Sequence, residues 1–121
     1  MVFLAKLDQI KVNDSCYDLF KSYLTKRRIC TVIDGCKSDI VEITAGVPQG
    51  SRLGPLLWII FINDIQDDLE SEVLLFADDT CLFSSDIDPA LTSKVLNRDL
   101  EKISLWANKW KVILNARKSK D

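Results

Sequence analysis

The chain contains no histidine among its 121 residues, and its four cysteines are scattered without a CxxC pair. A structural zinc site needs four closely spaced ligands, usually cysteine and histidine, so the sequence excludes an ordinary zinc domain. Cys30 and Cys36 are close enough in sequence to form a disulfide, but nothing else indicates secretion. We therefore expect reduced thiols and an intracellular protein, in the nucleus or the cytoplasm.

An excess of basic charge is also lacking, because 16 Lys and Arg stand against 18 Asp and Glu, for a net charge of −2. A complete nucleic-acid-binding domain usually shows a basic patch, so this balance counts against a self-sufficient domain of that kind. Long apolar runs are missing too: the longest, residues 55–62, is far shorter than the roughly 20 residues of a membrane helix. The N-terminal residues do not resemble a signal peptide. We expect a soluble protein with no membrane partner.

What is present is a globular composition, with 47% hydrophobic and 28% charged residues in a length that suits one domain, residues 1–121. Apolar residues at helical spacing predict helices over residues 4–10, 14–26 and 54–64. A fourth helix is predicted to start at Asp88-Pro89 and to keep one apolar face. That face comprises Leu96, Leu100, Ile103, Ala107 and Trp110.

Two hairpins and one further strand are predicted between and after these helices. Residues 29–33 and 41–44 flank the turn signal Asp34-Gly35, and the apolar strands 73–77 and 80–83 flank Asp78-Asp79. A last strand is expected over residues 111–115, before the polar tail. Helices and strands mix without regular βαβ alternation, which indicates an α+β fold.

Three basic residues, Lys26, Arg27 and Arg28, follow the second predicted helix. Cations are favoured at the negative C-terminal pole of a helix. We interpret the triplet as a helix-end feature, with a phosphate contact as the alternative.

The pair Asp78-Asp79 is the feature that carries chemistry. Two-residue hairpin turns favour Asn-Gly, Asp-Gly or Gly-X, and two aspartates between apolar strands are costly unless something neutralises them. A hard divalent cation such as Mg²⁺ binds one or two carboxylates together with substrate phosphates. An ordinary polar turn is the alternative. The chain contains a second acidic pair, Asp67-Asp68, in a polar stretch where no metal is needed. An Asp-Asp dipeptide is therefore weak evidence for a metal site by itself.

A second feature is the glycine-rich segment from Ala45 to Trp58, with glycines at positions 46, 50 and 54. Glycine lets a backbone approach a ligand closely, and the helix N-terminus that follows favours anions. Taken alone, the segment is more simply a connection between a strand and a helix.

Together these segments resemble the reverse transcriptases of non-LTR (LINE-type) retrotransposons. In that family a GVPQGSxLGPLLF-type segment leads into a helix that ends near Ile-Asn-Asp-Leu, and the FADDT hairpin follows. The corresponding segments here are GVPQGSRLGPLLW at 46–58, INDI at 62–65 and FADDT at 76–80. The family's paired tryptophans and N-x-x-K segment are matched by Trp106, Trp110, Asn115 and Lys118. Upstream, LAKL and LFKSYLTKR resemble the family's helices, so the resemblance covers essentially the whole chain.

The resemblance implies a polymerase palm, an antiparallel sheet with packed helices, that uses Mg²⁺ or Mn²⁺. Asp78 would be a metal ligand and Asp79 would assist it, as the catalytic pair. Phe76 or Ala77 would border the primer terminus. The partners would be an RNA template, a DNA primer, dNTPs and the rest of a longer retroelement polyprotein.

The resemblance also implies a substrate-binding group in the glycine-rich segment and the tail. Gln49 and Gly50, with Pro48 and Ser51, would line the pocket for the incoming nucleotide and template. Lys118 would lie near the triphosphate, where it would give a proton to pyrophosphate. A lysine in a polar tail is otherwise simply solvated.

The family's site uses a further aspartate upstream, at the end of an apolar strand, and nothing in this sequence matches that segment. The family's fingers and thumb are not matched either. We therefore expect a partial palm that binds Mg²⁺ weakly and does not extend a primer alone. The alternatives are a catalytically dead retroelement remnant with at most nucleic-acid binding, or another metal-dependent phosphotransferase, against which the PQG loop argues. The sequence encoded upstream of Met1 would distinguish the partial polymerase palm from the catalytically dead remnant.

Overall fold

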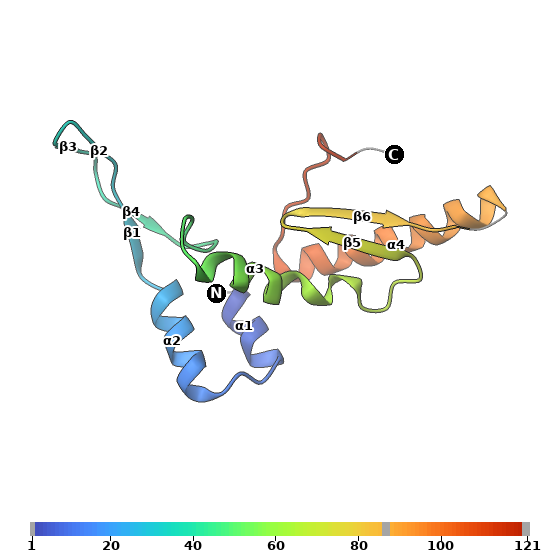
Figure 1. The fold of residues 1–121 in the computed structure, drawn as a ribbon, viewed down its shortest axis with the longest axis horizontal. Helices are drawn as coiled ribbons and strands as arrows, with labels where there is room; N and C mark the ends of the chain where they lie inside the picture. Colours follow the sequence, from blue (N-terminus) through green and yellow to red (C-terminus); the bar gives the residue numbers. More distant parts are fainter. Residues whose placement is uncertain (1, 86–87, 120–121) are drawn as a thin grey trace. The chain divides into compact units, whose positions relative to one another are not determined.

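The structure, a computed structural model, describes residues 2–85 and 88–119. It divides into two compact units, Met1–Phe61 and Ile62–Asp121, and Figure 1 shows the elements of both. The prediction of a single domain stays a prediction. Over the residues described, no helix is both long and apolar enough to cross a membrane. The last two residues of the predicted polar tail lie outside the described residues.

Two short helices open the first unit, as predicted. Helix α1 spans Val2–Gln9, and α2 spans Asp14–Leu24 and ends two residues before the predicted limit. The side chain of Asn13 caps α2 by accepting a hydrogen bond from the backbone N–H of Cys16 at 2.9 Å. The buried apolar side chains of this unit are Phe3, Leu7, Leu24, Leu57 and Phe61.

A long β-ribbon follows α2 and confirms the first predicted hairpin (Figure 1). Strand β1 (Arg27–Ile29) pairs antiparallel with β4 (Val41–Ile43). Beyond this pair, β2 (Val32–Ile33) pairs with β3 (Cys36–Lys37). The turn between β2 and β3 is Asp34-Gly35, and both residues have positive φ, 49° and 80°. This is the geometry that a type I′ hairpin turn requires, which is why the Asp-Gly signal was reliable.

Helix α3 runs over Leu53–Ile62, and a single 3₁₀ turn, η1 (Asn63–Gln66), continues it. The predicted helix over residues 54–64 is therefore correct in kind but ends two residues earlier in α-helical geometry. Leu57 and Phe61, four residues apart, point into the core of the first unit. The ring of Phe61 stacks on those of Phe3 and Trp58, with centroids 5.8 and 5.9 Å apart.

The second unit contains a regular hairpin, in which β5 (Glu72–Phe76) pairs antiparallel with β6 (Asp79–Phe83). Cross-strand partners share a face of the hairpin. One face is half-buried, at Val73, Leu75 and Leu82. The other face is exposed and partly apolar: Leu74, Phe76, Cys81 and Phe83 lie on it.

Helix α4 (Pro89–Trp110) starts as predicted, since the Asp88 carboxylate accepts a hydrogen bond from the N–H of Ala90 at 2.9 Å. Its buried face contains Ile103, Ala107 and Trp110. The prediction was wrong for Leu100, whose side chain is 51% exposed. Asp99, one position earlier, takes the buried place instead.

The predicted strand over residues 111–115 is wrong as well. Lys111 ends α4 in the left-handed conformation, with φ of 57°, and residues 112–115 have no strand partner among the residues described. Ile113 is 94% exposed. The apolar pattern of this segment predicted a strand, but a strand forms only where a neighbouring strand satisfies its backbone groups.

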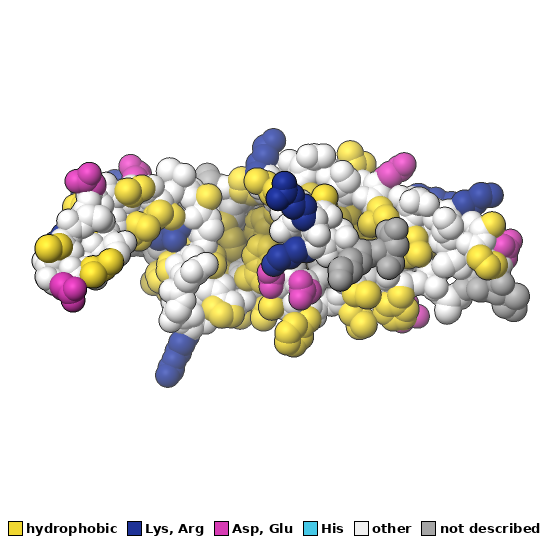
Figure 2. All heavy atoms as spheres, turned by 90° about the horizontal axis from the view of Figure 1, so that it is seen from above, with side chains coloured by type: hydrophobic (Ala, Val, Ile, Leu, Met, Phe, Trp, Pro, Cys, Tyr) yellow, Lys and Arg dark blue, Asp and Glu magenta, His cyan; other side chains and the backbone are white. Residues whose placement is uncertain are grey.

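Helices and antiparallel strands thus mix as an α+β fold predicts, but the strands form three separate two-stranded sheets. The assignment of this arrangement to a polymerase palm stays a prediction, as does the absence of fingers and thumb. Figure 2 shows hydrophobic side chains reaching the surface between acidic and basic ones.

Candidate functional site

The acidic pair lies at the β5–β6 turn, but one residue out of the predicted register. Phe76 pairs with Asp79, so the two central residues of the turn are Ala77 and Asp78, and Asp79 is the first residue of β6. The expectation that Asp78 and Asp79 together form the turn was wrong. The turn therefore needs positive φ at Ala77, which has φ of 53°.

An alanine in this conformation is strained, because its Cβ crowds the backbone in the left-handed region. Such a residue costs roughly 1–3 kcal/mol and persists where the surrounding structure fixes it. Type II′ turns give the same first central position to glycine. The β5–β6 ladder, with five residue pairs, holds Ala77 in place.

Both carboxylates of the pair are in solvent. Asp78 and Asp79 are exposed, as is Phe76 at 80%. The two aspartates therefore do not need a cation to neutralise them, contrary to the prediction, because hydrated carboxylates do not bear the cost of burial. What the turn does offer is two adjacent carboxylates that face solvent. Within the residues the structure describes, no group of three or more His, Cys, Asp or Glu side chains is placed to hold a metal ion.

The glycine-rich loop belongs to the first unit and connects β4 to α3. Gly46 and Gly50 have φ of 73° and 74°, which L-residues rarely adopt, and the space beside each is open. Between them, Gln49 is exposed and Pro48 is half-buried. The loop thus presents one amide side chain on a backbone bent by two glycines.

Ser51 and Gly54 have local structural roles in this loop. The Ser51 hydroxyl donates to the carbonyl of Pro48 at 2.8 Å and accepts from the N–H of Gly54 at 2.9 Å. A Cβ on Gly54 would lie 2.8 Å from the Pro48 carbonyl oxygen, so only glycine fits there. The close approach expected of Gly54 is therefore to the protein's own backbone.

Arg27 anchors the start of the same loop. Its Nε donates to the carbonyl of Leu24, at the end of α2, at 3.1 Å. Its Nη2 donates to the carbonyls of Ala45 and Gly46 at 2.9 and 2.6 Å. The contact with Leu24 confirms the helix-end interpretation for Arg27. The link to the glycine-rich loop was missed, because residues 18 positions apart show no pattern in the sequence.

Lys118 lies in a separate turn after α4 and is exposed. The carbonyl of Asn115 accepts hydrogen bonds from the N–H groups of Lys118 and Ser119, at 3.0 and 3.2 Å. The Asn115 side chain accepts another, from the N–H of Arg117. The N-x-x-K spacing is thus that of a local turn.

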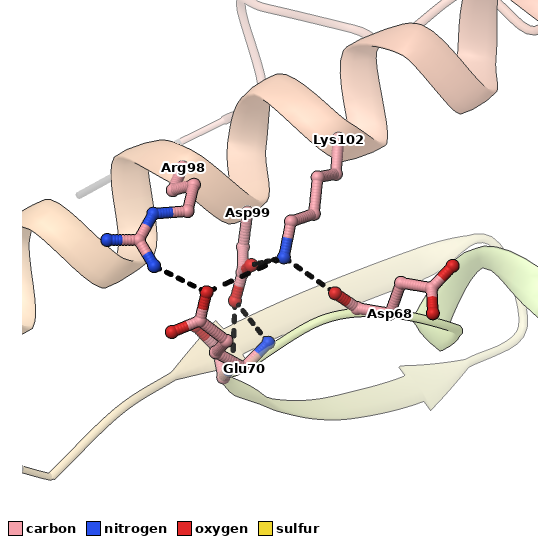
Figure 3. Close-up of polar contacts among 6 residues, drawn as sticks. Asp68, Glu70, Arg98, Asp99 and Lys102 are labelled. Atoms are coloured by element: carbon pink, nitrogen blue, oxygen red, sulfur yellow. Dashed lines mark hydrogen bonds and ion pairs between the residues drawn. The ribbon is translucent and has the colours of Figure 1, made fainter.

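Polar side-chain contacts link separate segments of the second unit, and the sequence did not predict them. The indole Nε1 of Trp106 donates to the Asp64 carboxylate at 2.8 Å, which joins the INDI segment to α4. The buried carboxylate of Asp99 accepts hydrogen bonds from the N–H groups of Glu70 and Ser71 at 2.9 and 2.7 Å (Figure 3). The available signal was an aspartate on the otherwise apolar stripe Leu96–Ile103–Ala107.

Among the described residues of the second unit, the carboxyl group of Asp99 has a shifted pKa. Burial raises the pKa of this carboxyl group, but the polar groups of Ser71, Lys102 and Glu70 lower it more. The net result is a pKa of about 2, below the usual 3.8. The carboxylate is therefore ionised at neutral pH, inside the protein.

Comparison with known proteins gives the family. A family model described as reverse transcriptase (RNA-dependent DNA polymerase) matches residues 3–121. The RNA-directed DNA polymerase from mobile element jockey of Drosophila melanogaster is 36% identical over 110 residues, which cover 84% of this chain and 12% of the relative. The probable RNA-directed DNA polymerase from transposon X-element of the same fly is 33% identical over 108 residues, with 85% and 12% covered.

A Pol polyprotein from the type-1 retrotransposable element R1 of Bradysia coprophila is 28% identical over 121 residues, covering 96% of this chain and 12% of the relative. The chain thus spans about 12% of the length of the curated relatives it matches. No solved structure matches it. With the family match across nearly its whole length and relatives from non-LTR elements, the chain belongs to the reverse transcriptase family of non-LTR retrotransposons, as its GVPQGS and FADDT segments predicted.

Proposed function

We propose that the chain is the palm part of an RNA-directed DNA polymerase, and that Asp78 and Asp79 hold the divalent metal ion of nucleotidyl transfer. The observation that carries the proposal is the turn itself. Two solvent-facing carboxylates follow one another at the tip of a five-pair antiparallel hairpin, in a chain that matches the reverse transcriptase family over residues 3–121.

The residues at the turn fit Mg²⁺ or Mn²⁺. These hard cations prefer oxygen ligands, and Mg²⁺ in polymerases is held by one or two carboxylates together with substrate phosphates and water. Asp78 would be a ligand from the turn, and Asp79 would assist it from the first position of β6. The exposure of both side chains leaves room for the phosphates and waters that complete the shell.

When bound, the metal ions lower the pKa of the primer 3′-hydroxyl and stabilise the leaving pyrophosphate. The protein residues position the reactants, which supplies most of the rate in phosphoryl transfer. Phe76, exposed on the same face as Asp79, would border the primer terminus with Ala77.

In this scheme the glycine-rich loop binds the nucleotide and the template. Gln49 and Gly50 would line the pocket, with Pro48 and Ser51 shaping the loop around them. The local hydrogen bonds of Ser51 favour a supporting role for its hydroxyl. Lys118 would neutralise the triphosphate from its turn. The substrates are then an RNA template, a DNA primer and dNTPs, and the rest of a longer polyprotein would supply further carboxylate ligands.

Metal binding at the turn is tested by titrating the ¹⁵N-labelled chain with Mn²⁺ and recording paramagnetic broadening of amide signals. We expect weak binding that broadens the signals of residues 76–80 first, with competition by Mg²⁺. The double variant Asp78→Asn/Asp79→Asn should remove the effect.

The matched control is Asp67→Asn/Asp68→Asn, which makes the same change of charge at the other acidic pair. Asparagine tolerates the positive φ of Asp68, 62°, so this variant keeps its backbone. Equal broadening at both pairs, or broadening that survives loss of Asp78 and Asp79, would refute the proposed metal site.

A second candidate function is a retroelement remnant without polymerase activity. It is favoured by the two-carboxylate site, since the described residues supply no third ligand. On either reading we expect the isolated chain not to extend an oligo(dT) primer on poly(rA). Extension that Asp78→Ala abolishes would show that the chain is active alone and would exclude the remnant.

A further inference from the structure

The residues just before β5 are fixed to α4 by a compact set of polar contacts (Figure 3). The Asp99 side chain is fully buried, and one of its oxygens, Oδ2, accepts hydrogen bonds from two successive backbone N–H groups. These belong to Glu70 and Ser71, at 2.9 and 2.7 Å. Two adjacent N–H groups that converge on one anion hold a chain segment in a single conformation.

Lys102, one turn of α4 further on, extends this set. Its Nζ donates to Oδ1 of Asp99 at 3.1 Å and to the backbone carbonyl of Asp68 at 2.6 Å. The Glu70 carboxylate lies 3.7 Å from Nζ and also pairs with Arg98 at the surface. Asp99 and Lys102 therefore bind backbone groups on both sides of Leu69.

These contacts fix the position of residues 68–71 more than they stabilise the folded chain. Apolar residues of similar size often stabilise a protein core as well as a buried charged pair does, because the charges lose hydration. Here the charges instead bind three specific backbone groups of residues 68–71. The segment is fixed in place on the helix.

The segment is continuous with the acidic turn. Ser71 immediately precedes Glu72, which pairs with Phe83 at the open end of the hairpin, and the ladder runs without a bulge to Phe76 and Asp79. A β-strand advances about 3.3 Å per residue, so the start of the turn lies roughly 20 Å from this anchor. An isolated two-stranded hairpin is marginally stable in water, so its place depends on where it is attached.

We propose that Asp99 and Lys102 are positioning residues for the Asp78-Asp79 turn: by fixing residues 68–71 to α4, they set the placement and order of the β5–β6 hairpin. Neither side chain touches the acidic pair. The proposal rests on the proposed metal function of that pair for its effect on binding, but its effect on the order of the hairpin is independent of it.

Two measurements on the full chain test the proposal: Mn²⁺ affinity from the broadening of turn amides, and hydrogen exchange of the β5–β6 amides. Affinity is read from the signals of folded molecules, so a change in overall stability alone does not move it. For Asp99→Asn we expect a loss of affinity on the order of tenfold, as for groups that orient metal ligands, and faster exchange along the hairpin. Lys102→Gln should show the same changes to a smaller extent and serves where Asp99→Asn fails to fold.

The matched control is Arg98→Gln, which removes the exposed ion pair with Glu70 and leaves the contacts of Asp99 and Lys102 in place. It should behave like the wild type in both measurements. Wild-type affinity and exchange in both Asp99→Asn and Lys102→Gln would overturn the inference. Absence of Mn²⁺ binding by the wild type refutes the metal site instead, and the exchange measurement then still decides whether Asp99 and Lys102 order the hairpin.

Discussion

The indole of Trp106 donates a hydrogen bond to the carboxylate of Asp64, at 2.8 Å, across 42 positions of sequence. Asp64 belongs to the INDI segment and Trp106 to the tryptophan pair of α4. The family resemblance gave the order of these two segments along the chain but predicted no contact between them. The structure gives them a joint role, because the contact links the turn η1 to the C-terminal part of the long helix.

Removing this donor should weaken the second unit. Trp106→Phe keeps most of the apolar surface and loses the N–H, so we expect the free energy of unfolding to fall by about 1–2 kcal/mol. Urea denaturation followed by circular dichroism measures it. A double-mutant cycle with Asp64→Ala isolates the pair, and a coupling energy near zero would show that the contact contributes nothing.

The buried carboxylate of Asp99 should make stability depend on pH in the acid range. Its pKa is lowered from 3.8 to about 2 in the folded chain, so the unfolded chain binds the proton more readily. The stabilisation is therefore present above pH 3.8 and is lost as the pH falls toward 2. Asp99→Asn should lower stability at neutral pH by on the order of 2 kcal/mol and flatten this part of the profile. Parallel profiles for the two proteins would contradict the assignment.

Ala77 should be one of the few positions where glycine stabilises the chain. The residue has φ of 53°, which glycine adopts without strain. For Ala77→Gly we expect a gain of up to about 1 kcal/mol, measured by thermal or urea unfolding. The same exchange at Ala90, in the first turn of α4, should cost about 0.5–1 kcal/mol. Loss of stability in both variants would mean that Ala77 is not strained.

Arg27 should control the order of the glycine-rich loop. Arg27→Lys replaces a planar guanidinium that reaches three backbone carbonyls by a single ammonium, which cannot match that geometry. We expect faster hydrogen exchange and proteolysis over residues 44–50, and a loss of stability of about 1–2 kcal/mol. Arg28→Lys, at the exposed neighbouring position of β1, is the control and should leave the loop unchanged. Equal effects of the two substitutions would show that loss of the Arg27 contacts is not the cause.

Local patterns were sufficient where the cause of the structure is local. Asp34-Gly35 predicted its hairpin turn because that dipeptide accepts two positive φ angles. Asp88-Pro89 predicted the start of α4 because capping involves only the next few residues. The same holds for the segments GVPQGS and FADDT, whose residues and spacing were enough to predict the reverse transcriptase family.

Patterns failed where the outcome depends on distant neighbours. The short apolar run within residues 111–115 predicted a strand, but no strand pairs with them in the described part of the chain. The register of the acidic hairpin shifted by one residue because Phe76 pairs with Asp79, which places Ala77 in the turn. Hydrophobicity along one segment does not contain this information, since pairing is a property of two segments.

The sequence by itself thus determined the family, the starts of α2 and α4 and the acidic pair at Asp78 and Asp79. Only the tertiary structure decided that this pair is exposed. It also decided that the charged side chains of Asp99 and Arg27 form hydrogen bonds with the protein's own backbone. The physical reason is that a charged side chain looks the same in sequence whether it meets solvent, a ligand or a backbone group. Which of these it meets depends on the contacts that folding brings to it.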